Sequence, residues 1–420
     1  MEINWKKNTA LFLTGQALSM FGSMVVQYAI MWHITLKTQS GIMITIFTIL
    51  GFLPMFFISP FGGVWADRFN RKYIINISDG AIAFASLVIA VFLILGFESF
   101  GILLIGTVVR SLGQGVQMPA VGAFIPQIVP ERHLTRINGI QSGIQSFITL
   151  TSPAASAALM SFTSLKMLFF VDVITAAFGI SVLFFFVKVP EPEKSGQQPE
   201  QKPLKYLHDL KEGLNYIKNH EYIFLLIIFS AVFMFFASPS AMLTPLQVSR
   251  NFGNEVWRLS AIEIAFSAGM MAGGLAIGFW GGFKNRIFTI TLSCALFGIE
   301  AIILGIAPVF WIYICAMVVV GITMPLYNTP LMVILQTSVE PEFMGRVLSV
   351  ITMLNSVMMP LGMLVFGPLS DAVSINLILV VTGIVMTLLC IPYAAIKSLR
   401  KAGQDCPPDT SALTDCKYTE

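Results

Sequence analysis

The sequence GGVWADRFNRK, at residues 62–72, combines two glycines, one acidic and three basic side chains within eleven residues. It stands out because only 11% of the chain is charged and because apolar runs of more than twenty residues flank it on both sides. A related stretch, GFWGGFKNR, occurs at residues 278–286. We interpret the first stretch as a polar turn between two membrane-spanning helices and the second as its counterpart in the other half of the chain.

The composition of the 420-residue chain is typical of an integral membrane protein. The chain is 56% hydrophobic and its mean hydropathy is +0.80, whereas soluble domains carry about 25% charged residues. A helix needs roughly 20 consecutive apolar residues to cross a bilayer, so most of the chain is expected to lie in lipid. The five cysteines show neither metal-ligand spacing nor a disulfide pattern, and no metal site is expected.

Apolar segments predict an all-α membrane fold with twelve transmembrane helices. The six segments of the first half lie near 9–35, 43–66, 73–96, 101–128, 137–161 and 166–187. The six of the second half lie near 222–245, 257–281, 287–306, 309–335, 346–369 and 375–396. The first run is too long for a signal-peptide core, so we expect it to be retained as a span.

One long polar segment, 188–220, separates the two groups of six and is the predicted cytoplasmic linker. The predicted domains are a first bundle at 1–187 and a second at 221–402. Within the linker, Leu204–Asn219 is expected to form a short amphipathic helix at the membrane surface. The polar tail at 403–420 is expected to be disordered.

The distribution of basic residues predicts the orientation in the membrane. With the N-terminus in the cytoplasm, 20 of the 25 Lys and Arg residues lie on the inner side and four on the outer side, with Arg110 left inside a helix. Cytoplasmic loops carry an excess of Lys and Arg. Both termini are therefore predicted to be cytoplasmic, which requires an even number of spans.

The two halves also contain related sequences. Four positions of the first stretch recur in the second, pairing Gly63, Trp65, Asn70 and Arg71 with Gly278, Trp280, Asn285 and Arg286. A second match pairs Pro119, Pro130 and Glu131 with Pro330, Pro341 and Glu342. Two parallel six-helix repeats are an architecture of secondary transporters, whose site lies near the midplane between the repeats.

These features resemble the major facilitator superfamily, and the resemblance covers the whole chain. The first stretch is similar to that family's signature between its second and third helices, G-x-x-x-D-R-x-G-R-[RK]. The matching positions, which we predict to form a gating motif, are Gly63, Asp67, Arg68, Arg71 and Lys72. Asn70 replaces the usual second glycine, and we expect it to adopt the left-handed conformation that glycine would supply.

The second copy of the motif keeps less of the signature. It retains Gly278, Lys284 and Arg286, but Gly282 stands where the first copy has Asp67. We therefore predict that Asp67 is the asymmetric, gating element. It is expected to dock at the cytoplasmic start of the eleventh helix, around Gly345–Arg346, because a helix N-terminus favours an acidic group. The bases of the motif are expected to hold the turn on the inner side and to brace neighbouring helices.

Within the superfamily, the chain is most similar to the macrolide-efflux branch of drug/proton antiporters. The similarity is carried by GFLPMFFISPFGGVWADRFNRK (51–72), RSLGQGVQMPA (110–120), EIAFSAGMMAGG (263–274) and PEFMGRVLS (341–349). Tetracycline and siderophore exporters share much of this pattern. The fifth helix departs from the antiporter pattern, since Ser152-Pro153 and small residues stand where a Gly-Pro pair is usual.

The resemblance implies a proton-coupled exporter of amphipathic drugs, macrolides first, that works by alternating access in a bacterial-type inner cell membrane. The expected partners are a small amphipathic substrate, protons and the lipid bilayer, with no nucleic acid, and we expect a monomer. The alternatives are export of tetracycline or a siderophore, or import of a nutrient by the same fold. A channel or a receptor would be other classes. The sequence has neither G-x-x-x-x-G-K-[ST] nor H-E-x-x-H, so we expect no enzyme and no cofactor, and energy from a proton gradient.

Five ionisable residues fall inside predicted helices, where an ion costs at least about 2.5–3.5 kcal/mol and needs a partner, a cavity or a proton. They are Asp79, Arg110, Asp172, Glu263 and Glu300. Arg110, roughly 13 Å from its helix start, is predicted either to line the cavity or to form a structural pair. Glu263, roughly 9 Å deep, is predicted to couple protons, or else to make a hydrogen-bonded helix contact. The other three are weaker coupling candidates or packing partners.

Overall fold

The computed structural model describes residues 5–188 and 206–396, and within these ranges the chain is helical and contains no strand. This architecture confirms that the fold is all-α, as predicted. The predicted tail at 403–420 and the start of the linker lie outside the described residues.

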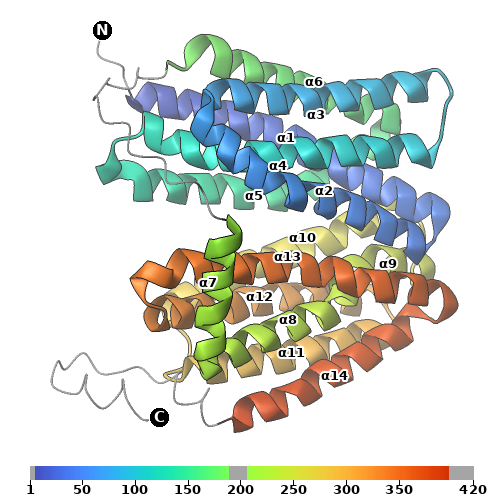
Figure 1. The fold of residues 1–420 in the computed structure, drawn as a ribbon. Helices are drawn as coiled ribbons and strands as arrows, with labels where there is room; N and C mark the ends of the chain where they lie inside the picture. Colours follow the sequence, from blue (N-terminus) through green and yellow to red (C-terminus); the bar gives the residue numbers. More distant parts are fainter. Residues whose placement is uncertain (1–4, 189–205, 397–420) are drawn as a thin grey trace.

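The first half forms one bundle, drawn in the upper part of Figure 1. Its elements are α1 (Trp5–Thr38), α2 (Gly41–Arg68), α3 (Arg71–Ile94), α4 (Phe100–Ile128), the 3₁₀ turn η1 (Glu131–His133), α5 (Leu134–Phe162), α6 (Leu165–Ser181) and the π-helical turn η2 (Val182–Phe186).

The second half forms the lower bundle, preceded by a helix at the predicted linker position (Figure 1). Its elements are α7 (Tyr206–Asn219), α8 (Glu221–Met242), α9 (Thr244–Asn251), α10 (Val256–Trp280), α11 (Arg286–Ile306), α12 (Phe310–Ser338), α13 (Pro341–Ala372) and α14 (Ile375–Ala395). In the described chain, nine helices are long and apolar enough to cross a membrane, and Ile375–Ile391 is a shorter apolar helix. The count of twelve spans therefore stays a prediction.

The two bundles meet at one end only (Figure 1). We call the end that carries the 62–72 turn and α7 the motif end, and the opposite end, where α2 begins and α13 finishes, the far end. At the far end α2 packs on α13, α5 on α10 and α1 on α9. At the motif end the bundles are spread apart, with α7 lying against α13 and α8.

The turn at 62–72 is organised by helix capping. Asn70 is the N-cap of α3, and its side-chain oxygen accepts a hydrogen bond from Lys72 N at 3.0 Å. Its φ of −64° is not left-handed, so the expected glycine-like conformation is wrong. Asn285, its counterpart in the second half, caps α11 in the same way, with Ile287 N at 3.0 Å. Capping by Asn satisfies a backbone N–H that the helix start leaves unpaired, which explains why Asn recurs here.

The second copy ends its helix differently. Gly281 and Gly282 have φ values of +77° and +86°, in the left-handed region that favours glycine, and α10 stops at Trp280. In the first copy the chain stays helical through Asp67 to Arg68. Gly282 occupies the position of Asp67 in the repeat. The second copy therefore lacks the acidic group, and its helix α10 also ends earlier in the motif than α2 does.

Equivalent helix pairs of the two halves cross closely at glycines. A Cβ on Gly62 of α2 would lie 2.8 Å from the backbone of Val116 in α4. A Cβ on Gly269 of α10 would lie 2.1 Å from the carbonyl oxygen of Val318 in α12. Both distances are shorter than a carbon contact allows, so these helices reach their present separation only with glycine.

Candidate functional site

The closure at the far end is built on Asp371, in the last turn of α13. Its carboxylate accepts hydrogen bonds from the first N–H groups of α2, at 2.7 Å from Gly41 N and 3.0 Å from Ile42 N. The hydroxyl of Ser40, the N-cap of α2, donates to it at 2.8 Å. A helix N-terminus presents unpaired N–H groups and a positive dipole end, so it binds a carboxylate well. An acidic residue of the second half thus caps a helix of the first.

Arg250 of α9 completes this closure. Its guanidinium donates to Asp371 Oδ1 at 2.9 Å and to the carbonyl oxygen of Ser370 at 2.6 Å. It also donates to the carbonyl oxygen of Gln39, in the α1–α2 connection. The side chain of Gln39 in turn accepts from Ser249 at 3.1 Å. We call Asp371 and Arg250, with the segment 39–42 that they hold, the far-end contact.

Close backbone packing adjoins the far-end contact. Gly41 of α2 lies so near α13 that a Cβ would fall 2.2 Å from the carbonyl oxygen of Gly367. One turn further along, the hydroxyl of Thr45 donates to the carbonyl oxygen of Met363 at 3.0 Å. The far ends of α2 and α13 are therefore in direct contact, with hydrogen bonds between the two halves.

At the motif end the matching contact is not made. Asp67 is exposed, with 58% of its side chain accessible, and lies 3.5 Å from Arg71 at the start of α3. Arg346 of α13 instead pairs with Glu212 of α7 at 2.9 Å. The expected docking of Asp67 on Gly345–Arg346 is therefore not found in this conformation, because the halves are spread apart here and α7 covers the start of α13.

The bases of the motif bind backbone carbonyl groups. Arg71 donates to the carbonyl oxygens of Ala66 and Ala123, both at 2.8 Å. The Lys72 ammonium donates to Phe184 O at 2.9 Å and to Val187 O at 2.8 Å. They connect the turn to α4 and to the end of the first bundle.

The remaining motif residues lie at the same end of the two bundles. Gly63 is partly buried within α2, and Arg68 is exposed at its end. In the second copy Gly278 and Lys284 are exposed, and Arg286 starts α11.

Arg110 is fully enclosed within the first bundle. Its guanidinium forms an ion pair with Asp172 of α6, and the two side chains are 1% and 0% exposed. It also donates to the carbonyl oxygen of Ser23 on α1 at 2.9 Å, while the hydroxyls of Ser23 and Ser86 donate to Asp172 at 2.7 and 2.6 Å. Of the two predicted roles, the geometry matches the structural pair, and Asp172 is its partner.

Two further carboxyl groups are buried among neutral donors. Asp79 of α3 accepts from Gln16 at 3.2 Å and from Gln117 at 2.6 Å, and so connects α1, α3 and α4. Glu300 of α11 accepts from Thr323 of α12 at 3.2 Å. Its other oxygen, Oε1, is buried and has no hydrogen-bond partner among the described residues. Each carboxyl lies within one bundle and away from the surface between the halves.

Glu263 is placed differently, because it faces the other half. Its carboxyl group lies beside the phenol group of Tyr28 of α1. Tyr313 of α12 is also near this carboxyl group, and its hydroxyl donates to Gln247 at 2.8 Å. Of the five ionisable residues predicted inside helices, this is the one that lies beside a side chain of the opposite bundle in the described structure.

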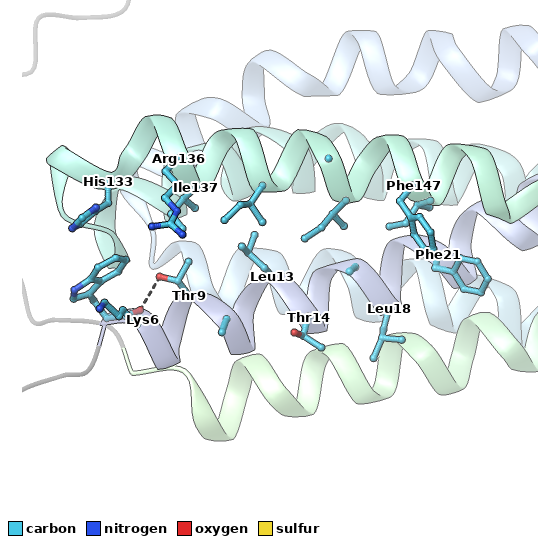
Figure 2. Close-up of a pocket in the computed structure, with 17 residues that line it drawn as sticks. Lys6, Thr9, Leu13, Thr14, Leu18, Phe21, His133, Arg136, Ile137 and Phe147 are labelled. Atoms are coloured by element: carbon cyan, nitrogen blue, oxygen red, sulfur yellow. Dashed lines mark hydrogen bonds between the residues drawn. The ribbon is translucent and has the colours of Figure 1, made fainter. Parts of the chain in front are cut away.

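A large groove runs between α1 and α5, with a volume of about 1030 Å³. Figure 2 shows Lys6, His133 and Arg136 gathered at one end of the groove and Phe21 and Phe147 at the other. The groove could not be predicted from hydropathy, because it depends on how α5 lies against α1.

Asp371 was not among the predicted site residues, although the sequence contains a signal for it. The pattern Gly-x-x-x-Asp occurs as Gly367–Asp371 at the end of α13, just as it occurs as Gly63–Asp67 at the end of α2. Asp371 lies at the edge of its apolar segment and was therefore not counted among the residues buried in the membrane.

Comparison with known proteins identifies the family of this chain. The sequence matches the Major Facilitator Superfamily over residues 10–363, so the chain belongs to this family of membrane transporters. It is similar to macrolide efflux protein A of Streptococcus pyogenes, with 30% identity over 400 residues that cover 95% of this chain and 98% of the relative. Macrolide efflux protein A of Enterococcus faecalis is also 30% identical, over 323 residues that cover 76% of this chain and 99% of the relative. The resemblance to the macrolide-efflux branch is thereby confirmed.

Solved structures share the fold. A variant of the nucleoside transporter NupG superposes with a TM-score of 0.68 at 16% identity, covering 93% of this chain and 99% of the other. A bacterial homologue of the iron transporter ferroportin, in an inward-facing state, superposes with a TM-score of 0.67 at 14% identity, with coverage of 93% and 99%. The family match and the nine apolar helices of the described chain identify a multi-pass membrane transporter that acts on a small molecule.

Proposed function

We propose that the chain is a secondary active exporter of bulky amphipathic drugs, with macrolide antibiotics the first candidates, and that it works by alternating access. The observation that carries the proposal is the one-sided closure, in which the halves are bonded through Asp371 at the far end and spread apart at the motif end. Rocking of two bundles about a site between them is the mechanism of this architecture. The similarity to the two macrolide efflux proteins supports export.

The orientation completes the proposal. The motif end, which carries most of the basic residues, faces the cytoplasm, and both termini lie there. The nine apolar helices, with α4, α5 and α14, make twelve spans in a bacterial cell membrane. In this orientation the present conformation is open to the cytoplasm and closed to the outside.

Glu263 is the proposed proton-coupling residue. It is on α10 of the second half, and its partner Tyr28 is on α1 of the first, so its charge state alters a contact between the halves. A neutral carboxyl can donate a hydrogen bond to the Tyr28 hydroxyl without placing a charge at the interface. Proton uptake from outside and release inside would then bias the two bundles in opposite directions, as a proton-driven exporter requires.

The test of coupling uses a matched pair of variants. Inverted membrane vesicles with the wild-type chain are expected to accumulate a labelled macrolide when a pH gradient is imposed. Glu263→Gln should lose at least about 90% of this uptake while binding the drug. Glu300→Gln, the same change at a buried carboxyl within one bundle, should keep most of it. Gradient-driven uptake at the wild-type rate by Glu263→Gln would exclude Glu263 as the coupling group.

The substrate class is tested in cells that lack their own drug exporters. Expression of the chain is expected to lower the accumulation of a macrolide, and a protonophore should restore it. Tetracycline and a siderophore serve as competing candidates in the same assay. A chain that lowers neither macrolide nor tetracycline accumulation, or that raises it, would contradict drug export.

A further inference from the structure

One buried carboxyl group of the first bundle has only neutral groups among its described hydrogen-bond partners. Asp79 of α3 is 2% exposed, and its two oxygens accept hydrogen bonds from Gln16 and Gln117. Arg110, which is buried in the same bundle, already forms its ion pair with Asp172. An ionised carboxylate inside a membrane is costly without a partner of opposite charge. Asp79 therefore requires a positive charge that these neighbours do not supply.

The atoms around Asp79 define one place for such a charge. Gln117 Nε2 lies between two oxygens, at 2.6 Å from Asp79 Oδ1 and 3.2 Å from Gln16 Oε1. Gln16 Nε2 lies 3.2 Å from Asp79 Oδ2, and the Ser19 hydroxyl is also beside the carboxylate. The Gln117 amide nitrogen thus stands where a small cation would contact both oxygens. An ion takes this place when the Gln117 side chain moves back and turns its own oxygen inward.

The side chains of this cluster offer oxygen ligands and a single negative charge. Two oxygens come from Asp79, and Gln16, Gln117 and Ser19 bring one each. Oxygen ligands suit hard cations, and the number of ligands and the size of the cavity select among these cations. One carboxylate balances one positive charge. In the described part of the chain no group of three or more His, Cys, Asp or Glu side chains could hold a metal ion, so a divalent ion would lack its usual charged ligands.

The cluster lies near the middle of the membrane-spanning helices. At 1.5 Å per residue, Asp79 lies roughly 12 Å from the start of α3, and Gln16 and Gln117 lie roughly 16 Å from the motif ends of α1 and α4. The middle of a hydrocarbon core is about 15 Å from either edge. Gln16 and Gln117 are partly exposed, and polar groups in a membrane face a water-filled opening or the bundle interior. Coupling-ion sites of secondary transporters lie at this depth.

We infer that Gln16, Ser19, Asp79 and Gln117 form a binding site for one Na⁺ ion within the first bundle. The ion supplies the charge that Asp79 lacks, and it links α1, α3 and α4 at the level of the membrane centre. A compact cluster of oxygens suits Na⁺ better than the larger K⁺. The site shares no residue with the proposed coupling contact of Glu263, so the inference goes beyond the proposed function and does not depend on it.

Two pairs of variants test the inference. Asp79→Asn removes the charged ligand with little change of shape, and Glu300→Gln, at a buried carboxyl of the second bundle, is its control. Gln117→Leu removes a neutral ligand. Gln114→Leu makes the same change at another partly exposed glutamine of α4 and is the control for it. Gln117→Leu, at a partly exposed position, provides the test if Asp79→Asn is unstable.

The measurement is equilibrium binding of radioactive Na⁺ to the purified full chain, without drug and at constant ionic strength. The wild-type chain is expected to bind one labelled ion, which excess unlabelled Na⁺ displaces and K⁺ does not. Asp79→Asn should weaken binding at least about 100-fold, because the buried ion loses its one charged ligand. Gln117→Leu should weaken it about tenfold, because one contact to a charged group is lost. Both controls should match the wild type.

Three outcomes would overturn the inference. The first is displacement of the labelled ion by K⁺ as well as by Na⁺, and the second is unchanged Na⁺ binding in Asp79→Asn or Gln117→Leu. The third is a wild-type chain that binds no Na⁺ but gains heat stability on acidification, with no gain in Asp79→Asn, which would assign a proton to this carboxyl. Thermal unfolding verifies that each variant is folded. The wild type should unfold at a higher temperature in NaCl than in choline chloride, because an ion that binds only the folded chain stabilises it.

Discussion

The two ends of the α2–α13 pair have the same arrangement, an acidic residue near the end of one helix beside the start of the other. Only the acidic residue at the far end contacts the opposite helix. At the far end, Asp371 lies in the last turn of α13 and accepts hydrogen bonds from the first N–H groups of α2. At the motif end, Asp67 lies near the end of α2, while the start of α13 is held by α7. Each acidic residue follows a glycine by four positions. We interpret Asp371 and Asp67 as parts of two gates, of which the first is closed and the second is open. A rocking motion of the bundles would open the first and close the second.

α7 adds an asymmetry to this comparison. Its Tyr216 stacks on Phe343 of α13 with ring centroids 4.7 Å apart, and its hydroxyl accepts from Glu340 N at 3.3 Å. Together with the Glu212–Arg346 pair, these contacts occupy the helix start that Asp67 is predicted to reach. At the far end the short helix α9 instead reinforces the engaged contact through Arg250. The motif end would therefore close only when α7 moves away from the start of α13, or when α7 and Asp67 contact that helix start together.

The largest effect is expected from Asp371→Ala. The substitution removes several hydrogen bonds to a charged group, each with a net value of about 1.5–3 kcal/mol, so the far-end contact should weaken by at least about 3 kcal/mol. This corresponds to a shift of roughly 100-fold between the two conformations. Spin labels at Lys166 and Ser374, in a chain freed of its natural cysteines, should report a longer far-end distance.

Glu98→Ala, which removes another exposed acidic side chain near the far end of the first bundle, is the control for Asp371→Ala. It should leave the distance distribution unchanged. If Asp371→Ala also leaves it unchanged, the far-end contact does not hold the halves together and the comparison of two gates fails.

A smaller effect of the opposite sign is expected from Asp67→Asn. In the present conformation Asp67 makes one exposed ionic contact, so drug binding here should change less than twofold. In the opposite conformation an acid at a helix start contributes about 1–2 kcal/mol, and its loss should lower transport turnover about tenfold. Turnover in vesicles and binding by calorimetry separate the two quantities.

Glu131→Gln, a neutralised acid in η1 at the same end, is the matched control for Asp67→Asn. It is expected to keep wild-type turnover. Loss of drug binding in Asp67→Asn, with normal turnover of the remaining bound drug, would show that Asp67 is a binding residue and not part of a gate.

The smallest effect is expected from Glu212→Gln. The Glu212–Arg346 pair is partly exposed, so its loss should contribute less than about 1 kcal/mol and shift the conformations by less than fivefold toward closure of the motif end. Labels at Arg132 and Lys284 measure this distance. In an Asp67→Asn background the shift should disappear, because α13 then lacks its competing partner. A shift of equal size in both backgrounds would show that α7 does not compete with Asp67 for the start of α13.

Much of the architecture could be predicted from the sequence because it rests on local properties. Apolar runs and the charge asymmetry predicted membrane helices and a polar linker, and a helix is indeed found at Tyr206–Asn219. The repeated Asn70 and Asn285 marked two helix starts, although the expected backbone conformation was wrong. A cap depends on three neighbouring residues and can be recognised without knowing the fold.

The candidate site was less predictable because its contacts join distant helices. Arg110 and Asp172 were both identified as costly ions, but their pairing depends on the rotation of α4 and α6 about their axes. Asp371 was missed because its hydrogen-bond partners are at the start of α2, more than three hundred residues away. Hydropathy does not record which helix end an acidic side chain will face.

The sequence by itself determined that this chain is a membrane protein, where most of its long helices lie and where the motif turn is, since burial of apolar residues and backbone capping act within short segments. Only the tertiary structure decided which of two similar acidic residues is engaged. Asp371 reaches the first N–H groups of α2 because the bundles close at that end, and Asp67 is left exposed because they are spread apart at the other.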